Sequence, residues 1–167
     1  MDVTARIIHR AYFNQTMVDP FCVILLLAMC LLIIVVGRRF AVWPMIVIAC
    51  FVTQAQRFSP GGVDFTFLRL ITIAAIVRVV VRGEFAGFKF NGADAAVLAF
   101  MGVRVLWAFL KITKGTAVTP LTMCGDALDM WGMYFFFRCV VRDFGDLKWA
   151  TYGFILASVP VAILFIV

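Results

Sequence analysis

Three ionisable side chains lie where the sequence is otherwise apolar, and their types and spacing could support chemistry. Asp126 and Asp129 fall inside an apolar run that begins at Pro120, and Arg104 lies near the middle of the preceding run. Aspartates three residues apart share one face of a helix, so both can meet the same partner. A charge inside such a run costs roughly 2.5–3.5 kcal/mol unless it faces protein or water. We therefore expect a buried ion pair or triad of Arg104 with Asp129, Asp126 or both, between two adjacent antiparallel helices.

This group of charges has two interpretations. In the first, the ion pair only fixes the register of the two helices. In the second, the charges line a polar cavity that holds a substrate phosphate or sugar. Aromatic residues at 131 and 134–137 follow the aspartates, and they either pack between helices or form the wall of a sugar site.

The composition predicts an all-α, polytopic helical membrane protein with about six transmembrane helices. The chain is 65% hydrophobic and 14% charged, with a mean hydropathy of +1.07, whereas a soluble domain is about half apolar and a quarter charged. The net charge of +6 comes from residues at the ends of the apolar runs. This placement indicates a lipid bilayer with anionic headgroups as the partner and argues against nucleic acid.

The apolar runs divide the chain into an interfacial N-terminal arm, 1–19, and a single helical bundle, 20–167. In the arm, apolar and basic residues alternate as in an amphipathic helix lying on a membrane surface. Asp19 is expected to cap the first helix ahead of Pro20. The expected spans are 20–36, 40–53, 65–81, 95–110, a fifth that begins at Pro120, and 149–167.

Motifs for a self-contained active site are not found in the sequence. The single histidine, His9, and the five scattered cysteines do not form a metal-binding pattern, so we expect no metal site and no cofactor. There is also no nucleophile–base pairing, phosphate-binding loop or dinucleotide-binding glycine motif. Arg69, Arg78 and Arg82 lie near span ends, where an arginine can extend its charge towards the headgroups.

Two stretches resemble bacterial O-antigen ligase-like and polysaccharide polymerase-like membrane proteins. The first is 62–69 leading into 76–85, and the second is 126–129 through 134–139 and then 141–147. The likeness covers residues 20 to 150 approximately. It suggests that this chain is the N-terminal half of such a protein.

The resemblance implies a metal-independent glycosyltransferase of the bacterial cytoplasmic membrane that acts in cell-surface polysaccharide biosynthesis. Such enzymes transfer a glycan from undecaprenyl diphosphate, hold the diphosphate with arginines and carry a catalytic residue on a large external loop. The candidate substrate-binding residues are Arg69, Arg78, Arg104 and Arg138, and no catalytic residue is assigned. Because the chain ends in an apolar run before any such loop, we expect it to be a fragment.

Two other functions fit the same residues. The chain could be a non-catalytic membrane subunit or scaffold, in which the buried charges only register helices. It could also be a small transporter, in which Arg104, Asp126 and Asp129 relay a proton or a substrate.

Overall fold

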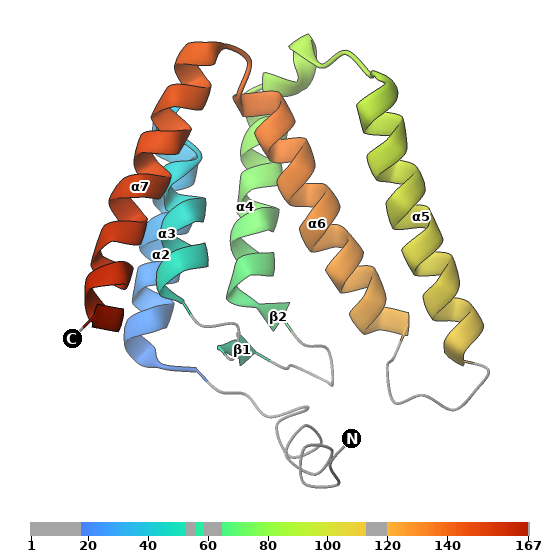
Figure 1. The fold of residues 1–167 in the computed structure, drawn as a ribbon, viewed down its shortest axis with the longest axis horizontal. Coiled ribbons are helices and arrows are strands. Elements are labelled where there is room, and N and C mark those ends of the chain that lie inside the picture. The colour runs from blue at the N-terminus through green and yellow to red at the C-terminus, as the bar shows by residue number, and fades with distance from the viewer. Residues whose placement is uncertain (1–17, 53–55, 59–64, 113–119, 167) are drawn as a thin grey trace, which may run out of the picture.

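The computed structural model describes residues 18–52, 56–58, 65–112 and 120–166. The chain over these residues is mostly helical (Figure 1). Almost all of the predicted N-terminal arm, 1–19, lies outside the described residues, as does most of the segment between the second and third predicted spans. The segment 113–119, between the fourth and fifth predicted spans, is also outside them.

Six α-helices follow one another along the described chain, close to the positions of the six apolar runs. They are α2 (Pro20–Val35), α3 (Trp43–Phe51), α4 (Phe67–Val81), α5 (Gly92–Ile112), α6 (Pro120–Val140) and α7 (Phe144–Ile166). In the connections that the structure describes lie the short 3-10 helices η1 (Arg38–Phe40) and η3 (Glu84–Gly87). The sequence did not predict the two-stranded antiparallel ribbon of β1 (Arg57–Phe58) with β2 (Phe65–Thr66).

These helices correct the predicted architecture. α2, α3 and α4 contain 16, 9 and 15 residues, fewer than the roughly 20 that a helix needs to cross a bilayer core. The longer helices contain ionisable residues, such as Arg104 in α5, Asp126 and Asp129 in α6, and Asp146 in α7. Among the described residues, no helix combines the length and the apolar character needed to cross a membrane. The prediction of a polytopic membrane protein with about six transmembrane helices is therefore wrong.

Local capping explains where the first helices begin. The Asp19 carboxylate accepts a hydrogen bond of 2.8 Å from the Phe21 amide, which confirms the predicted cap ahead of Pro20. At the start of α4, the Thr66 hydroxyl accepts from the Arg69 amide at 3.2 Å. Pro44 lies in the first turn of α3, where its missing N–H is not needed.

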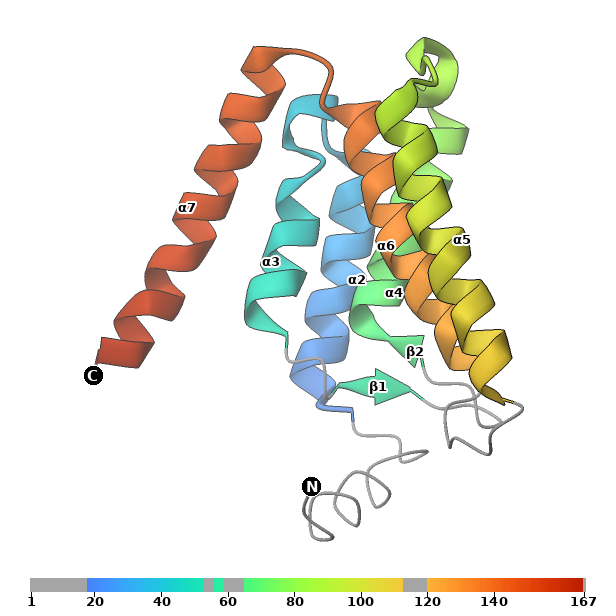
Figure 2. The same cartoon turned by 45° about the vertical axis from the view of Figure 1, so that its right-hand side comes forward.

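α4 lies at the centre of the bundle and packs against α2, α3 and α6 (Figures 1 and 2). Its buried face consists of Phe67, Ile71, Ala75 and Val79, each at most 3% exposed. A spacing of four residues keeps them on one side of the helix. α5 packs on α6, and α7 packs on α3, with its C-terminal end turned away from the rest of the bundle (Figure 2).

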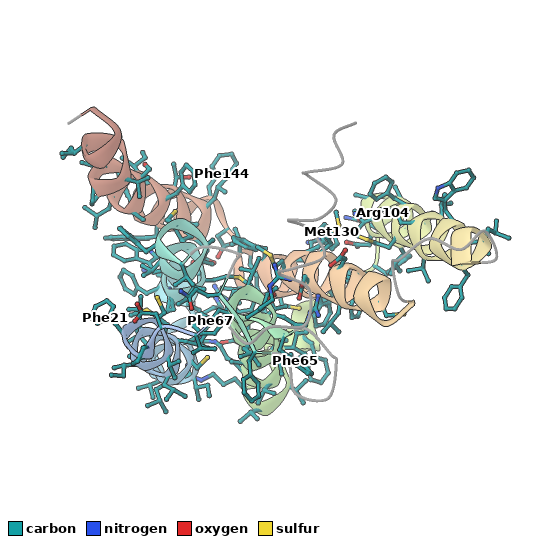
Figure 3. All side chains as sticks on the ribbon, turned by 90° about the horizontal axis from the view of Figure 1, so that it is seen from below. Phe21, Phe65, Phe67, Arg104, Met130 and Phe144 are labelled. Atoms are coloured by element: carbon teal, nitrogen blue, oxygen red, sulfur yellow. The ribbon has the colours of Figure 1, made fainter. Side chains whose placement is uncertain are left out.

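The outer surface also carries large apolar side chains. Figure 3 shows Phe67 between the helices, whereas Phe21 and Phe144 lie on the outside. Phe67 is 3% exposed, but Phe21 and Phe144 are 74% and 91% exposed. The high apolar content of the sequence is therefore divided between the core and the surface.

Gly132 allows a close approach between α4 and α6. A Cβ atom at this position would lie 2.6 Å from Thr72 Cγ2 and 3.0 Å from Ile76 Cδ1. Thr72 is fully buried and its hydroxyl donates to the Leu68 carbonyl at 2.8 Å. The two helices can therefore separate, or Thr72 can move, only by disturbing the core.

We expect Gly132→Ala to destabilise the fold even though alanine is the better helix former. The helical propensity gain is about 1 kcal/mol, and overpacking a core costs about 1–3 kcal/mol, so the net loss is about 1 kcal/mol. Gly102→Ala in α5 is the matched control, because a Cβ atom there meets nothing within 4 Å. It should stabilise the protein by about 0.5–1 kcal/mol. Urea unfolding of both variants measures whether the two changes in the free energy of unfolding have opposite signs. Equal changes would contradict the close packing at Gly132.

Candidate functional site

Both aspartates of α6 share one arginine from α4. Arg69 Nε donates to the two carboxylate oxygens of Asp129 at 3.2 and 3.3 Å, and Arg69 Nη2 reaches Oδ2 at 3.1 Å. The same Nη2 lies 3.5 Å from Asp126 Oδ1. The Arg69 side chain is only 7% exposed, compared with 16% for Asp129 and 48% for Asp126. Arg69 is thus a largely buried cation held by two carboxylates.

The backbone around this cluster explains how Arg69 reaches α6. Its amide is bound by the Thr66 cap, so it lies in the first turn of α4. Opposite it, Gly125 lacks the Cβ atom that would lie 2.4 Å from the guanidinium. A glycine directly before Asp126 therefore lets the guanidinium lie against the helix that carries its two partners.

The environment of Asp129 acts on its pKa in both directions. Burial raises the pKa of this carboxyl above its ordinary value, and the nearby Asp126 charge raises it further. The hydrogen bonds and the charge of Arg69 lower the pKa, but burial is the largest effect and the net direction is upward. Folding therefore disfavours the charged form of Asp129, and Arg69 only partly offsets this effect.

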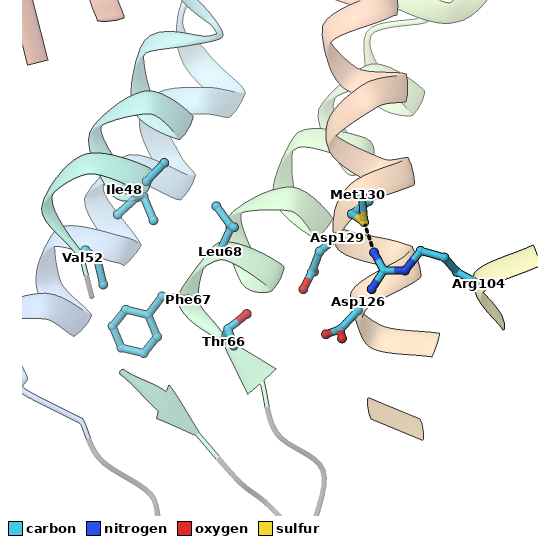
Figure 4. Close-up of a pocket in the computed structure, with 10 residues that line it drawn as sticks. Ile48, Val52, Thr66, Phe67, Leu68, Arg104, Asp126, Asp129 and Met130 are labelled. Atoms are coloured by element: carbon cyan, nitrogen blue, oxygen red, sulfur yellow. Dashed lines mark hydrogen bonds between the residues drawn. The ribbon is translucent and has the colours of Figure 1, made fainter. Parts of the chain in front are cut away.

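A cavity of about 390 Å³ opens beside the two carboxylates, within the range of about 300–1,000 Å³ that is usual for small-molecule sites. We call it the polar cavity. It is lined by Ile48, Ala49 and Val52 from α3, Thr66, Phe67 and Leu68 at the start of α4, Arg104 from α5, and Asp126, Asp129 and Met130 from α6 (Figure 4).

Arg104 faces this cavity but does not take the partner that the sequence predicted for it. Its Nη1 donates to the Met130 thioether at 2.8 Å (Figure 4). Among the described residues it makes no ion pair with Asp126 or Asp129, although all three line the same space. A thioether sulfur is a weak acceptor, so the guanidinium keeps most of its hydrogen-bonding capacity.

The other two candidate arginines lie away from the polar cavity. Arg78 is fully buried near the end of α4, where Nη2 meets Glu84 Oε1 at 2.9 Å and Nη1 donates to the carbonyls of Ile33 and Val36. Nine residues separate Arg78 from Arg69, which is about 13 Å along a helix. This distance keeps Arg78 away from the polar cavity. Its hydrogen bonds instead satisfy carbonyl groups at the C-terminal end of α2.

Arg138 belongs to a third group, at the start of α5. Its Nε lies 3.3 Å from Asp94 Oδ1, and the Tyr134 hydroxyl donates to the same oxygen at 2.5 Å. Asp94 and Asn91 exchange backbone-to-side-chain hydrogen bonds of 2.8 and 3.0 Å, which cap the helix. Of the four candidate arginines, only Arg104 lines the cavity, and Arg69 lies behind its wall, bound to the two aspartates that line it.

Acid should abolish the contribution of Tyr134 to stability. The Tyr134 hydrogen bond is the largest effect that lowers the pKa of Asp94, so the stabilisation is present above the ordinary pKa of a carboxyl and is lost as pH falls through the lowered value. We expect Tyr134→Phe to reduce the free energy of unfolding at pH 7, and the difference from the parent to shrink in acid. Urea titrations at both pH values measure it. Tyr152→Phe, at a half-exposed position in α7, is the control and should change little at either pH.

The aromatic residues after the aspartates do not line the polar cavity. Trp131 and Phe135 stack with ring centroids 5.4 Å apart, and Phe135 meets Phe88 at 5.5 Å. Phe136 is fully buried in the core. The cavity instead takes its aromatic wall from Phe67, which sequence reasoning did not single out.

Sequence reasoning also missed Arg69 as the partner of the two aspartates. The predicted partner, Arg104, lies on the helix preceding α6, whereas the observed cation comes from α4, one helix earlier. Gly125 was the available signal, because a glycine beside paired aspartates in a helix marks a place where another group can approach closely.

Metal ligation has no candidate in the part of the chain that the structure describes. No group of three or more histidine, cysteine, aspartate or glutamate side chains is placed there to hold an ion. Comparison with known proteins finds no matching family model, curated protein or solved structure. The comparisons therefore give no family evidence for the predicted glycosyltransferase, which stays a prediction of the resemblance.

Proposed function

We propose that this chain binds a neutral, hydroxyl-rich ligand such as a sugar in the polar cavity. The supporting observation is that Arg104, bound only to a thioether among the described residues, faces the same space as the carboxylates of Asp126 and Asp129. Guanidinium groups only donate hydrogen bonds and ionised carboxylates only accept them. Sugar hydroxyls do both, so they match a wall of this kind.

The balance of charge favours a neutral ligand over a diphosphate. Arg69 and Arg104 are matched in number by Asp126 and Asp129, so the cavity region has no net charge. A phosphate about 5 Å from a carboxylate is repelled by roughly 3 kcal/mol at an effective dielectric constant of about 20. Two such repulsions cancel the attraction of the arginines. A cationic ligand would in turn be repelled by the two guanidinium groups.

The remaining walls suit the non-polar face of a sugar ring. Phe67 supplies an aromatic ring, and Ile48 and Val52 supply aliphatic surface. Carbon-bound hydrogens of a pyranose can lie on such a surface while the hydroxyls face the charged side. The ligase or polymerase reaction, and its undecaprenyl diphosphate-linked glycan, stay predictions of the resemblance.

Calorimetric titration with methyl glucoside, methyl galactoside and inorganic diphosphate tests this function. We expect at least one glycoside to bind, and Arg104→Met to weaken its binding by about 10- to 150-fold, because a hydrogen bond to a charged group contributes about 1.5–3 kcal/mol. Arg39→Met is the control, since that side chain is 71% exposed and belongs to the Asp146 cluster. Diphosphate binding more tightly than every glycoside would contradict the proposal, as would an Arg104→Met variant with unchanged affinity.

A further inference from the structure

We infer that the ligand of the polar cavity is an amphiphile, with an apolar chain lying in a second hollow that adjoins the cavity between α5 and α6. This inference rests on the proposed function. The second hollow, here called the outer groove, is a shallow depression that is widely open to the outside, with a volume of about 580 Å³. Its walls include Met101, Gly102 and Val105 of α5 and Ala127, Leu128 and Trp131 of α6.

The outer groove differs from the polar cavity in chemistry. None of its lining residues carries a charged side chain, and most are aliphatic or aromatic. Polar hydroxyls gain nothing there, whereas each methylene removed from water contributes favourably. Its two walls are helices that pack on each other, so the groove follows the seam between them.

A third, much smaller hollow, here called the neck, shares lining residues with both of the others. It is lined by Met101, Arg104, Val105, Asp126 and Ala127, and it holds only about 10 Å³, about the space of one water molecule. Arg104 and Asp126 also line the polar cavity, whereas Met101, Val105 and Ala127 also line the outer groove. The polar cavity and the outer groove are therefore separated only by the side chains that line the neck.

Arg104 is the side chain that can open this neck. It is exposed and is held by the sulfur of Met130, in contrast to Arg69, which is held by two carboxylates. When the guanidinium turns from Met130 to a hydroxyl of the ligand head, it leaves the wall of the neck. Binding of the head then makes room for the first methylenes of the chain.

A series of glucosides with methyl, butyl, hexyl and octyl chains, each below its micelle concentration, tests the inference by calorimetry. We expect affinity to rise by about fourfold for each methylene that becomes buried. Gly102→Phe should remove most of this rise while leaving methyl glucoside binding unchanged, because a Cβ atom at Gly102 meets nothing within 4 Å and the added ring enters the groove. Val103→Phe is the matched control, since Val103 is 65% exposed and does not line the groove.

The possible outcomes separate this inference from the function on which it rests. Binding of methyl glucoside with no dependence on chain length overturns the inference and leaves the proposed function standing. Absence of binding by every glucoside overturns both, beginning with the proposed function. Octanol binding as tightly as octyl glucoside overturns the joint site, because the head would then contribute nothing.

Discussion

Replacing Arg78 with methionine should cost about 3–5 kcal/mol of stability, among the largest effects of any single substitution in this chain. The guanidinium is fully buried and joins three elements: it lies in α4, pairs with Glu84 of η3 and donates to the carbonyls of Ile33 and Val36 at the end of α2. Methionine keeps the apolar volume but removes every donor. Glu84, whose side chain is 11% exposed, would be left as a nearly buried charge without its partner.

Arg82→Met is the matched control for this prediction. Arg82 lies one turn further along and also donates to the end of α2, at 2.9 Å from the Val35 carbonyl and 3.1 Å from that of Val36. It is exposed, so water can replace it, and its loss should cost about 0.5–1.5 kcal/mol. Urea unfolding followed by far-ultraviolet circular dichroism compares the two. If Arg78→Met proved no more harmful than Arg82→Met, burial would not be what makes this guanidinium important.

Hydropathy located the helices well but misjudged their lengths. Hydropathy identifies apolar residues but not their backbone hydrogen bonds. The ends of an apolar run can therefore include residues that are not helical. The run expected to form a span from Phe65 begins with two residues that pair with Arg57 and Phe58 in the β-ribbon. In the run expected from Phe40, the first residue belongs to the 3-10 helix η1, and the α-helix α3 begins only at Trp43. The helices that form, α3 with 9 residues and α4 with 15, are therefore shorter than the apolar runs that predicted them.

The polar cavity could be anticipated only in part. The expectation that consecutive helices are adjacent brought Arg104 together with Asp126 and Asp129, and all three do line one space. The same expectation could not reveal Arg69, because pairing across non-consecutive helices depends on how closely they approach. That approach is set by Gly125 and Gly132, where a Cβ atom would lie 2.4 Å from Arg69 and 2.6 Å from Thr72. Periodicity carries no information about such distances.

Arg69→Met should be the second large effect, costing about 3 kcal/mol, and Asp129→Asn should reverse much of it. Removing Arg69 leaves the carboxylates of Asp126 and Asp129 three residues apart without their shared cation, and the loss of one partner of a buried ion pair costs about 3–5 kcal/mol. The exposure of Asp126 places this site at the lower end of that range. Burial already raises the pKa of Asp129, so its charge becomes the more unfavourable of the two when Arg69 is absent.

The raised pKa also fixes how these effects vary with pH. A carboxyl whose pKa is raised on folding stabilises the protein fully below its unfolded pKa of about 3.9, and that stabilisation is lost as pH rises through the folded value. Arg69→Met raises the folded pKa of Asp129 further, so its cost should grow between acid and neutral pH. Asp129→Asn alone should cost less than Arg69→Met at pH 7, because it removes a charge that burial disfavours and leaves Asp126 as a charged partner of Arg69.

A double-mutant cycle of Arg69→Met with Asp129→Asn, measured by urea unfolding in acid and at pH 7, tests both parts. At pH 7 the coupling free energy between the two substitutions should be about 1–3 kcal/mol, within the range for contacting residues, and in acid it should be smaller. Arg69→Met with Asp146→Asn is the control, because Asp146 pairs with Arg38 and Arg39 in a separate cluster, and that pair should be additive. Additivity of Arg69 with Asp129 as well would mean that α4 and α6 are held together by packing at Gly132 and not by the shared charge.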